Sequence, residues 1–341
     1  MKFAVGYQLH EGEEESFVDI VMSYLEHIEE VYFPWLDTPT GRSSLSNRRG
    51  IVNWKAQEQL ENDLLTLRKA GVKLDLLLNA NCYGRNSMSQ YLANNICSII
   101  DHIGNTVGGV DIVTTASPAI AHVVKLSFPD IEVRASVNMR IGTVKGMQYL
   151  AYLFDSYCMQ RDYNRNLEYI KELLDWAKAN GKKLVMLANS GCLSFCSGQI
   201  FHDNLVAHES EIGETYNITE WTPYTCWNYY KDPDNWVSVL QNTWIRPEDL
   251  HNYEEYFSVV KLATRMHSRP GMVIDAYARR KYYRNLLDLF EPGFGPAFAP
   301  YVIDNSKFPD DWFEVTSKCN KKCHECNYCK NVLKTVLVRA E

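Results

Sequence analysis

The stretch KLDLLLNANCYGRNSMSQYLANNICSIIDHIG, residues 73–104, contains the unit that decides the fold. Residues 73–80 form a short apolar run typical of a buried strand. Residues 89–104 carry apolar side chains at the spacing of an amphipathic helix. A strand followed by a helix is the repeating unit of parallel sheets. The stretch therefore predicts one β/α unit.

Similar units recur along the chain. The nine strand candidates are FAVGY (3–7), EVYF (30–33), KLDLLLNA (73–80), GVDIVTT (109–115), IEVRASV (131–137), FDSYCM (154–159), KKLVMLA (182–188), TWIRPEDL (243–250) and SVVKLAT (258–264). A closed barrel needs eight parallel strands, so we expect either TWIR or FDSYCM to be irregular. The alternation predicts a TIM-like (β/α)8 barrel. A doubly wound open sheet is the alternative, but the first strand lacks the G-x-G-x-x-G turn of its nucleotide-binding version.

Composition narrows the class of protein. Of the 341 residues, 46% are hydrophobic, which is enough for one large core. A formal net charge of −7 argues against general attraction to nucleic acid or anionic membranes. The N-terminus MKFAVGYQLHEGEEE lacks the features of a secretory signal, and no apolar run approaches the roughly 20 residues of a membrane span. We expect a cytoplasmic protein without a membrane span.

Three regions are expected. Residues 1–290 would form the barrel. Residues 291–311, EPGFGPAFAPYVIDNSKFPDD, are rich in Gly and Pro and predict an irregular linker. Residues 312–341 contain KCNKKCHECNYCK (318–330) and predict a short cysteine-rich, metal-binding tail.

The tail has the spacing C-x3-C-x2-C-x2-C. Its cysteines are Cys319, Cys323, Cys326 and Cys329. The residues between them are polar or charged, which excludes burial as small apolar side chains. Four thiolates bind an iron-sulfur cluster or zinc. Bacterial ferredoxin loops have a partly similar spacing. Tight spacing within one segment is less usual for zinc sites, which are built from two separated pairs, so the pattern favours a cluster, and structural zinc is the alternative.

A second group of cysteines follows the strand at 182–188. In NSGCLSFC (189–196), Cys192 and Cys196 are four residues apart in a glycine-containing loop that can turn both sulfurs toward one metal. Cys226 is a plausible third ligand. The fourth position is Cys82, Cys158, a non-cysteine ligand or an open site for substrate. The alternative is that these loop cysteines are incidental.

Polar side chains follow several of the predicted strands, where barrels of this type place their active sites. The substrate-binding candidates are Asn81, Asn138, Arg140 and Asn189. The catalytic candidates are Arg161, Asp162, Arg246, Glu248 and His202. Arg246 would bind a substrate carboxylate or phosphate, although Pro247 and Glu248 also fit a purely structural helix start.

His202 and His208 lie six residues apart on a predicted helix, which puts them on different faces and disfavours a two-histidine zinc site. His202 is a candidate proton donor near the cysteines. A hydrogen-bonded helix histidine without a chemical role is the alternative.

Three segments resemble a known family. They are FDSYCMQRDYNRNLEYIKELL (154–174), LVMLANSGCLSFC (184–196) with FHDNLVAH (201–208), and IRPEDLHNYEEYFSVVKLATR (245–265). Together they resemble the collagenase-like U32 peptidases, in a divergent branch that ends in a cysteine-rich segment. The resemblance is specific from Arg161 onward and weaker over the first 100 residues.

The resemblance implies a barrel that carries an oxygen-sensitive 4Fe-4S cluster on cysteines at the strand ends. Carried over, the ligands fall on Cys192, Cys196 and Cys226. Better-understood relatives hydroxylate ubiquinone precursors or RNA bases without dioxygen, drawing the oxygen atom from prephenate. This chain departs from them in cysteine spacing and in its tail, so their substrate and fourth ligand do not transfer.

The sequence therefore favours an iron-sulfur oxidoreductase or hydroxylase that acts on a small or medium organic substrate at the barrel mouth. The tail would hold a second cluster and relay electrons from a donor protein. A peptidase acting on a peptide substrate is one alternative, although the chain contains no G-x-S-x-G or H-E-x-x-H motif. A zinc-stabilised RNA-binding module is another, which the net charge disfavours.

Overall fold

The computed structural model describes residues 1–10, 15–36, 38–41, 53–215, 218 and 220–340. The barrel strands are β1 (Lys2–Gly6), β2 (Ile28–Pro34), β3 (Lys73–Leu78), β4 (Ile112–Thr115), β5 (Glu132–Ala135), β6 (Ser156–Cys158), β7 (Lys183–Leu187) and β8 (Val259–Lys261). They form a closed barrel in sequence order, in which neighbouring strands are parallel and β8 pairs with β1. The predicted TIM-like barrel is confirmed.

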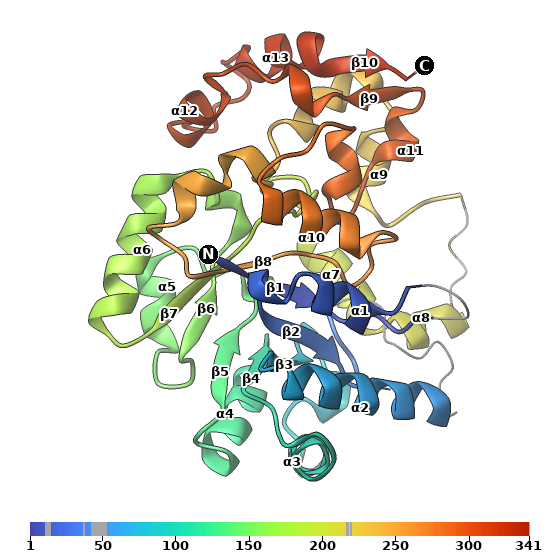
Figure 1. The fold of residues 1–341 in the computed structure, drawn as a ribbon, viewed down its shortest axis with the longest axis vertical. Helices are drawn as coiled ribbons and strands as arrows, with labels where there is room; N and C mark the ends of the chain where they lie inside the picture. Colours follow the sequence, from blue (N-terminus) through green and yellow to red (C-terminus); the bar gives the residue numbers. More distant parts are fainter. Residues whose placement is uncertain (11–14, 37, 42–52, 216–217, 219, 341) are drawn as a thin grey trace.

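Helices surround this barrel (Figure 1). They are α1 (Phe17–Ser23), α2 (Trp54–Lys69), α3 (Gln90–Val107), α4 (Pro118–Ser127), α5 (Val144–Tyr149), α6 (Leu167–Ala179), α7 (Gln199–Ala207), α8 (Glu209–Thr215), α9 (Thr225–Tyr229) and α10 (Pro270–Arg279). None of the described helices is both long and apolar enough to cross a membrane.

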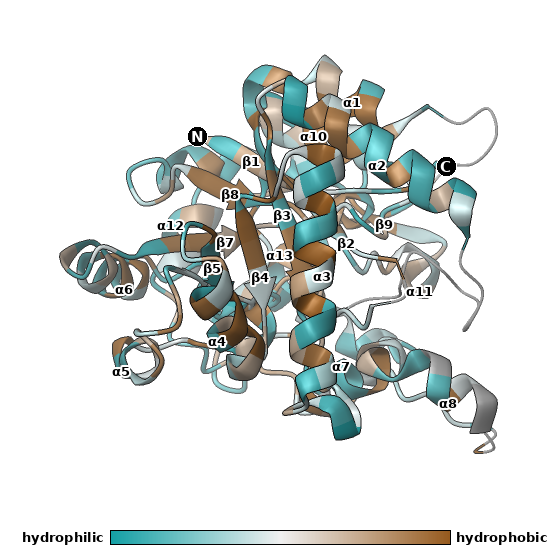
Figure 2. Cartoon of the chain, turned by 90° about the horizontal axis from the view of Figure 1, so that it is seen from below, coloured by the Kyte–Doolittle hydropathy of each residue, from teal (hydrophilic) through white to brown (hydrophobic). Residues whose placement is uncertain are grey.

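Helix α3 illustrates how the sequence specifies these elements. Ser89 caps its N-terminus by accepting a hydrogen bond from the Leu92 backbone N–H. Gly108 ends it in the left-handed conformation, with a φ of 93°, which glycine adopts without strain. Its buried face is lined by Ile96, Ile99, Ile100, Ile103 and Val107. Figure 2 shows hydrophobic and hydrophilic stretches alternating along α3.

The ninth strand candidate, TWIR, is the irregular one. FDSYCM supplies β6, whereas residues 243–246 form no strand and lead into a 3-10 helix, η6 (Pro247–Tyr253). The segment crosses the end of β7, where the Ile245 N–H donates to the Ala188 carbonyl over 2.8 Å. Pro247 has no N–H to continue a strand ladder. We expected either TWIR or FDSYCM to be irregular, and the structure confirms this for TWIR.

The barrel interior contains a buried ion-pair network. Arg134 on β5 donates to both carboxylate oxygens of Glu30 on β2, over 2.6 and 2.9 Å. Glu132 lies 3.0 Å from the same guanidinium, and Asp75 lies 3.7 Å from it. Because a guanidinium this deeply buried needs paired acceptors, the carboxylates explain how Arg134 is tolerated in the barrel.

The C-terminal region is more regular than expected. Residues 291–311, predicted as an irregular linker, contain α11 (Gly295–Phe298), β9 (Tyr301–Ile303) and a short 3-10 turn, η8 (Asn305–Lys307). Strand β9 pairs antiparallel with β10 (Leu337–Arg339), and α12 (Trp312–Ser317) and α13 (Tyr328–Val336) lie between them in sequence. This region lies together at one end of the molecule, at the top of Figure 1.

Candidate functional site

A small polar cavity of about 70 Å³ lies at the carboxyl ends of the barrel strands. Its lining includes the sequence-predicted Asn138, Cys158 and Arg161, together with Lys261 and Arg265, which were not predicted. Arg161, Lys261 and Arg265 are cationic, and one carboxylate, that of Glu291, also lines the cavity. The cavity therefore suits an anionic group on a substrate.

Arg161 is fixed at this cavity by a chain of hydrogen bonds. Its guanidinium donates to the Gln199 side-chain oxygen, and Gln199 donates to Asp203 over 2.8 Å. Asn81 donates to Asp203 over 3.5 Å, so two predicted residues are joined through α7. The Asn81 Oδ1 atom is buried and has no hydrogen-bond partner among the described residues.

Lys261 on β8 was not among the predicted site residues. Its position as a lysine within the apolar run SVVKLAT could have indicated it from the sequence. Its ammonium lies 3.7 Å from the centre of the Tyr32 ring, a cation–π contact. Burial lowers the pKa of Lys261, and Asp75 and Cys158 oppose that change. Burial also raises the pKa of Asp75 to about 6, against the effects of Lys261 and Arg134.

The loop of Cys192 and Cys196 is held by Asp162. The Asp162 carboxylate accepts hydrogen bonds from the Phe195 backbone N–H and from the Ser194 hydroxyl, both between the two cysteines. Phe195 has a φ of 52°, a left-handed conformation that costs energy for a non-glycine residue. The aspartate thus stabilises a strained loop that presents Cys192 and Cys196 beyond β7.

Cys226 on α9 joins this pair from a separate segment. Burial raises the pKa of Cys226 to about 11, and Cys192 and Cys196 add to the rise. Thr225, the neighbour of Cys226, lines one cavity together with Cys196. Burial likewise raises the pKa of Cys196, while the nearby cations Arg161 and Arg140 oppose the rise. We refer to Cys192, Cys196 and Cys226 as the barrel cysteines.

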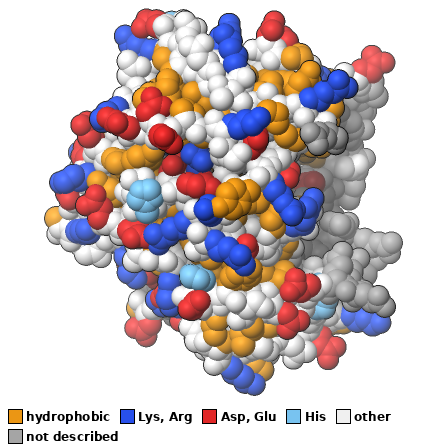
Figure 3. Space-filling model, turned by 45° about the horizontal axis from the view of Figure 1, so that its top comes forward, with side chains coloured by type: hydrophobic (Ala, Val, Ile, Leu, Met, Phe, Trp, Pro, Cys, Tyr) orange, Lys and Arg blue, Asp and Glu red, His pale blue; other side chains and the backbone are white. Residues whose placement is uncertain are grey.

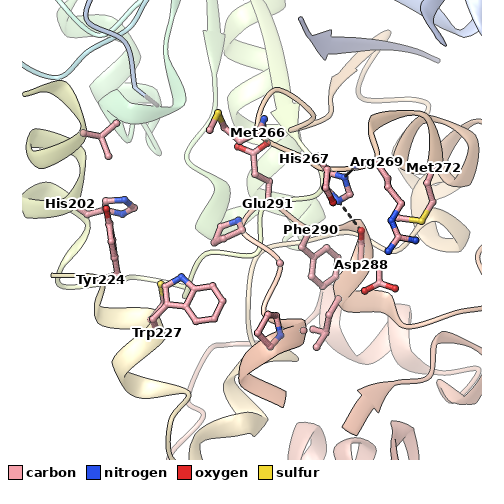
Figure 4. A pocket seen from close by; sticks show the side chains of 18 of the residues that line it. His202, Tyr224, Trp227, Met266, His267, Arg269, Met272, Asp288, Phe290 and Glu291 are labelled. Atoms are coloured by element: carbon pink, nitrogen blue, oxygen red, sulfur yellow. Dashed lines mark hydrogen bonds between the residues drawn. The ribbon is translucent and has the colours of Figure 1, made fainter. Parts of the chain in front are cut away.

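A larger cavity of about 500 Å³ lies beside Cys226. Figure 4 shows His202 and Tyr224 on one side of it and Glu291 and Phe290 on the other. The rings of His202 and Tyr224 lie edge to face with centres 5.1 Å apart. His202 is therefore near the barrel cysteines, as the sequence analysis proposed for a proton donor.

The remaining substrate-binding candidates differ in how well their side chains are placed to contact a substrate. Asn189 is fully buried and uses its amide to join β7 to β8, accepting from the Ala263 N–H and donating to the carbonyls of Ala263 and Leu289. Asn138 lines the small cavity and donates to the Asn79 carbonyl over 3.3 Å. Arg140, with a φ of 53°, ends the 3-10 turn that follows β5. Asn138 is thus better placed than Asn189 to contact a substrate.

No family model matches the chain. The chain is 26% identical over 289 residues to the "Uncharacterized protease MJ1657" of Methanocaldococcus jannaschii, and the match covers 82% of each protein. The solved structure of the U32 peptidase Mk0906 matches with a TM-score of 0.51 and 17% identity, covering 77% of this chain and 92% of that one.

The chain is thus similar to a relative that is named a protease and to a solved U32 peptidase. The resemblance seen in the sequence is thereby confirmed, and the similarity to Mk0906 shows the same barrel architecture.

Arg246 and Glu248 do not line the small cavity. Arg246 donates to the side chain and backbone of Asn305 over 2.9 and 3.1 Å, and its guanidinium lies 4.5 Å from the centre of the Phe308 ring. Glu248 accepts from the Asn305 amide over 2.9 Å and from the Tyr282 backbone N–H over 2.7 Å. These contacts attach the C-terminal region to the barrel, and the catalytic roles expected for Arg246 and Glu248 stay predictions.

One cysteine of the tail shares a cavity with one of the barrel cysteines. A cavity of about 380 Å³ between the two groups is lined by Cys196 from the loop and by Cys323 and Lys321 from the tail. Burial raises the pKa of Cys329 to about 11; Arg165 opposes the rise, and Cys319, Cys323 and Cys326 add to it. The tail sulfurs are thus within electrostatic reach of one another.

The donor chemistry of both groups fits a metal, although the thiols are not gathered around one point. Among the described residues, no group of three or more His, Cys, Asp or Glu side chains is arranged to hold a metal ion. A thiol moves by rotation about a single bond, so small adjustments can bring neighbouring sulfurs together. Cys192, Cys196 and Cys226 would be the barrel ligands, and Cys319, Cys323, Cys326 and Cys329 the tail ligands.

Proposed function

We propose that this protein is an iron-sulfur enzyme that carries out a redox or oxygen-independent hydroxylation reaction on a small or medium organic substrate. The observation that carries the proposal is that Cys226 lines the cavity of about 500 Å³, while Cys196 lines the cavity of about 380 Å³ together with Thr225, the neighbour of Cys226. When bound, an iron-sulfur cluster supplies electron transfer or a Lewis-acidic iron.

The protein's own residues have distinct roles in this proposal. Arg161, Lys261 and Asn138 bind an anionic group of the substrate at the barrel mouth. Asp162 holds the loop that presents the cysteines. His202, beside Tyr224, holds or moves a proton in the large cavity.

Metal and sulfide analysis of protein purified without oxygen tests the proposal. We expect about four to eight iron atoms and as many sulfides per chain, with a brown absorption that bleaches in air. Finding zinc without sulfide would overturn the iron-sulfur proposal.

A peptidase is the second candidate, because the relative from M. jannaschii is named a protease and Mk0906 is named a U32 peptidase. Peptide cleavage that persists in metal-free protein, or with zinc alone, would favour it. Loss of that cleavage in the His202→Ala variant would locate it in the large cavity.

An RNA-binding module is less well supported. On the face shown in Figure 3, basic side chains are interspersed with acidic ones, and the whole chain carries a net charge of −7. Binding of RNA that weakens steeply with added salt, in the absence of redox activity, would favour this function.

A further inference from the structure

A buried arginine joins the barrel to the tail. Arg165 lies between the 3-10 turn η4 (Arg161–Tyr163) and α6, and it is 5% exposed. Its Nε donates to the Trp244 carbonyl over 3.0 Å, and its Nη1 donates to the Leu240 carbonyl over 2.9 Å. Its Nη2 is buried and has no hydrogen-bond partner among the described residues. The guanidinium of Arg165 therefore donates only to neutral carbonyl groups, and its Nη2 atom is left without an acceptor among the described residues.

Aromatic rings from the barrel and the tail surround this guanidinium. Its carbon lies 4.2 Å from the centre of the Trp244 ring and 5.1 Å from that of Trp312, which opens α12. Trp312 stacks in turn on Tyr328, the neighbour of Cys329, with ring centres 6.1 Å apart. These contacts fix the position of the charge but do not neutralise it.

Burial lowers the pKa of Arg165, and ionisable groups of both the tail and η6 oppose that change. Cys329 has the largest favourable effect on its charge, followed by Tyr253, Asp249 and Cys319. Asp249 is itself 3.9 Å from Arg246, so it is shared with another cation. Among the described residues, no carboxylate lies within ion-pair distance of Arg165. A buried guanidinium cannot lose its proton and is costly without a compensating charge.

We propose that Arg165 balances the negative charge of a resident metal–thiolate centre on Cys319, Cys323, Cys326 and Cys329, so that metal loading of the tail and its attachment to the barrel are coupled. This inference rests on the proposed metal site in the tail. Four thiolates around Zn²⁺, or around an oxidised 4Fe-4S core, leave a net charge of about −2. Lys321, within electrostatic reach of Cys319, Cys323 and Cys329, supplies a second cation. Arg165 acts as a positioning residue and contacts no substrate in this scheme.

The first test measures release of tail metal from the full-length protein to a chelator, for the parent, Arg165→Gln and Arg165→Lys. We expect Arg165→Gln to speed release by about tenfold to a hundredfold, as other changes beside metal ligands do. Arg165→Lys keeps the charge and should remain closer to the parent. Equal release from the parent and Arg165→Gln would overturn the role of Arg165.

A Cys319→Ser/Cys329→Ser variant separates this inference from the proposed metal site. If that variant retains all the metal of the parent, the tail holds none, and both proposals for the tail fail. If the metal of the tail is lost as expected, Arg165→Gln should lower the thermal midpoint of the parent but leave that of the Ser variant unchanged or raised. An equal decrease in both backgrounds would mean that Arg165 is only a packing residue, which contradicts charge balance.

Discussion

The barrel cysteines and the tail cysteines differ in how the chain brings them together. Cys192 and Cys196 follow β7, whereas Cys226 lies on α9, so a folded barrel is needed to bring the two segments to one cavity. The tail cysteines, Cys319 to Cys329, lie within one short segment and are close by local sequence. The barrel cysteines are held beside a cavity because the barrel fold positions them. The tail cysteines can come together wherever their segment lies.

The electrostatic surroundings of the two groups differ as well. The barrel group lies near Arg161 and Arg140 and adjoins cavities that could admit a substrate. The tail group lies near Arg165, which is covered by Trp244 and Trp312. The difference suggests chemistry at the barrel and a charge-balanced structural or relay centre in the tail.

The largest expected effect is on metal at the barrel. Replacing Cys226 with Ser removes one of three thiolates, so we expect the barrel's share of iron and sulfide to be lost while the tail keeps its metal. Elemental and sulfide analysis of anaerobically purified protein measures this. Cys97→Ser is the matched control, because Cys97 lies on α3 and belongs to neither group. An unchanged iron content in Cys226→Ser would contradict the three-ligand assignment.

The next effect separates the tail from the barrel. Trp312→Ala removes a ring that is 1% exposed and stacks with Trp244, so we expect a loss of about 3–5 kcal/mol in the free energy of unfolding of the region that contains it. Hydrogen exchange should show faster exchange in α12 and α13 with α2 and α3 unaffected. Trp54→Ala, at a residue 74% exposed, is the control and should have little effect. Uniformly faster exchange across the barrel would contradict separate roles for the two regions.

A smaller effect is expected from the residue that supports the barrel loop. Asp162→Asn removes the charge that accepts from the Phe195 N–H, and we expect metal affinity at the barrel to fall about tenfold to a hundredfold. Competition with a chelator measures the change. Asp175→Asn, in an exposed pair with Lys171, is the control. If Asp162→Asn lost metal from the tail alone, Asp162 would not support metal binding at the barrel cysteines.

The smallest effect concerns pH. Burial raises the pKa of Cys226 to about 11 from an ordinary value of 9.0. In metal-free protein, the stability that the neutral thiol contributes is fully present below pH 9.0 and is lost as the pH rises through about 11. The difference in thermal midpoint between metal-free parent and Cys226→Ser should therefore shrink at alkaline pH. If this difference grew with pH, ionisation of the Cys226 thiol would not destabilise the folded protein.

Much of the barrel was predictable because a βα repeat leaves a local signal. Apolar runs of strand length and capped amphipathic helices, such as α3 with Ser89 and Gly108, are visible without the structure. TWIR is apolar enough to resemble a strand, but its pairing depends on where the chain crosses β7, which is tertiary information. The regular elements of residues 291–311 depend in the same way on β10, far along the chain.

The site was only partly predictable for a similar reason. The positions of Cys192, Arg161 and Asp162 follow from strand ends, and the structure brings them together around the barrel mouth. Arg165 carries no motif, and its relation to Cys329 arises only from packing. Asn189 shows the converse: it follows a strand as an active-site residue would, yet its amide is occupied by backbone hydrogen bonds.

The most direct measurement is the iron and sulfide content of a variant in which Cys319, Cys323, Cys326 and Cys329 are all replaced by Ser, purified without oxygen. The barrel cysteines alone should retain about four iron atoms and four sulfides per chain, with an absorption that bleaches in air. Absence of iron and sulfide from this variant, when the parent contains both, would contradict a cluster at the barrel and place all the metal in the tail.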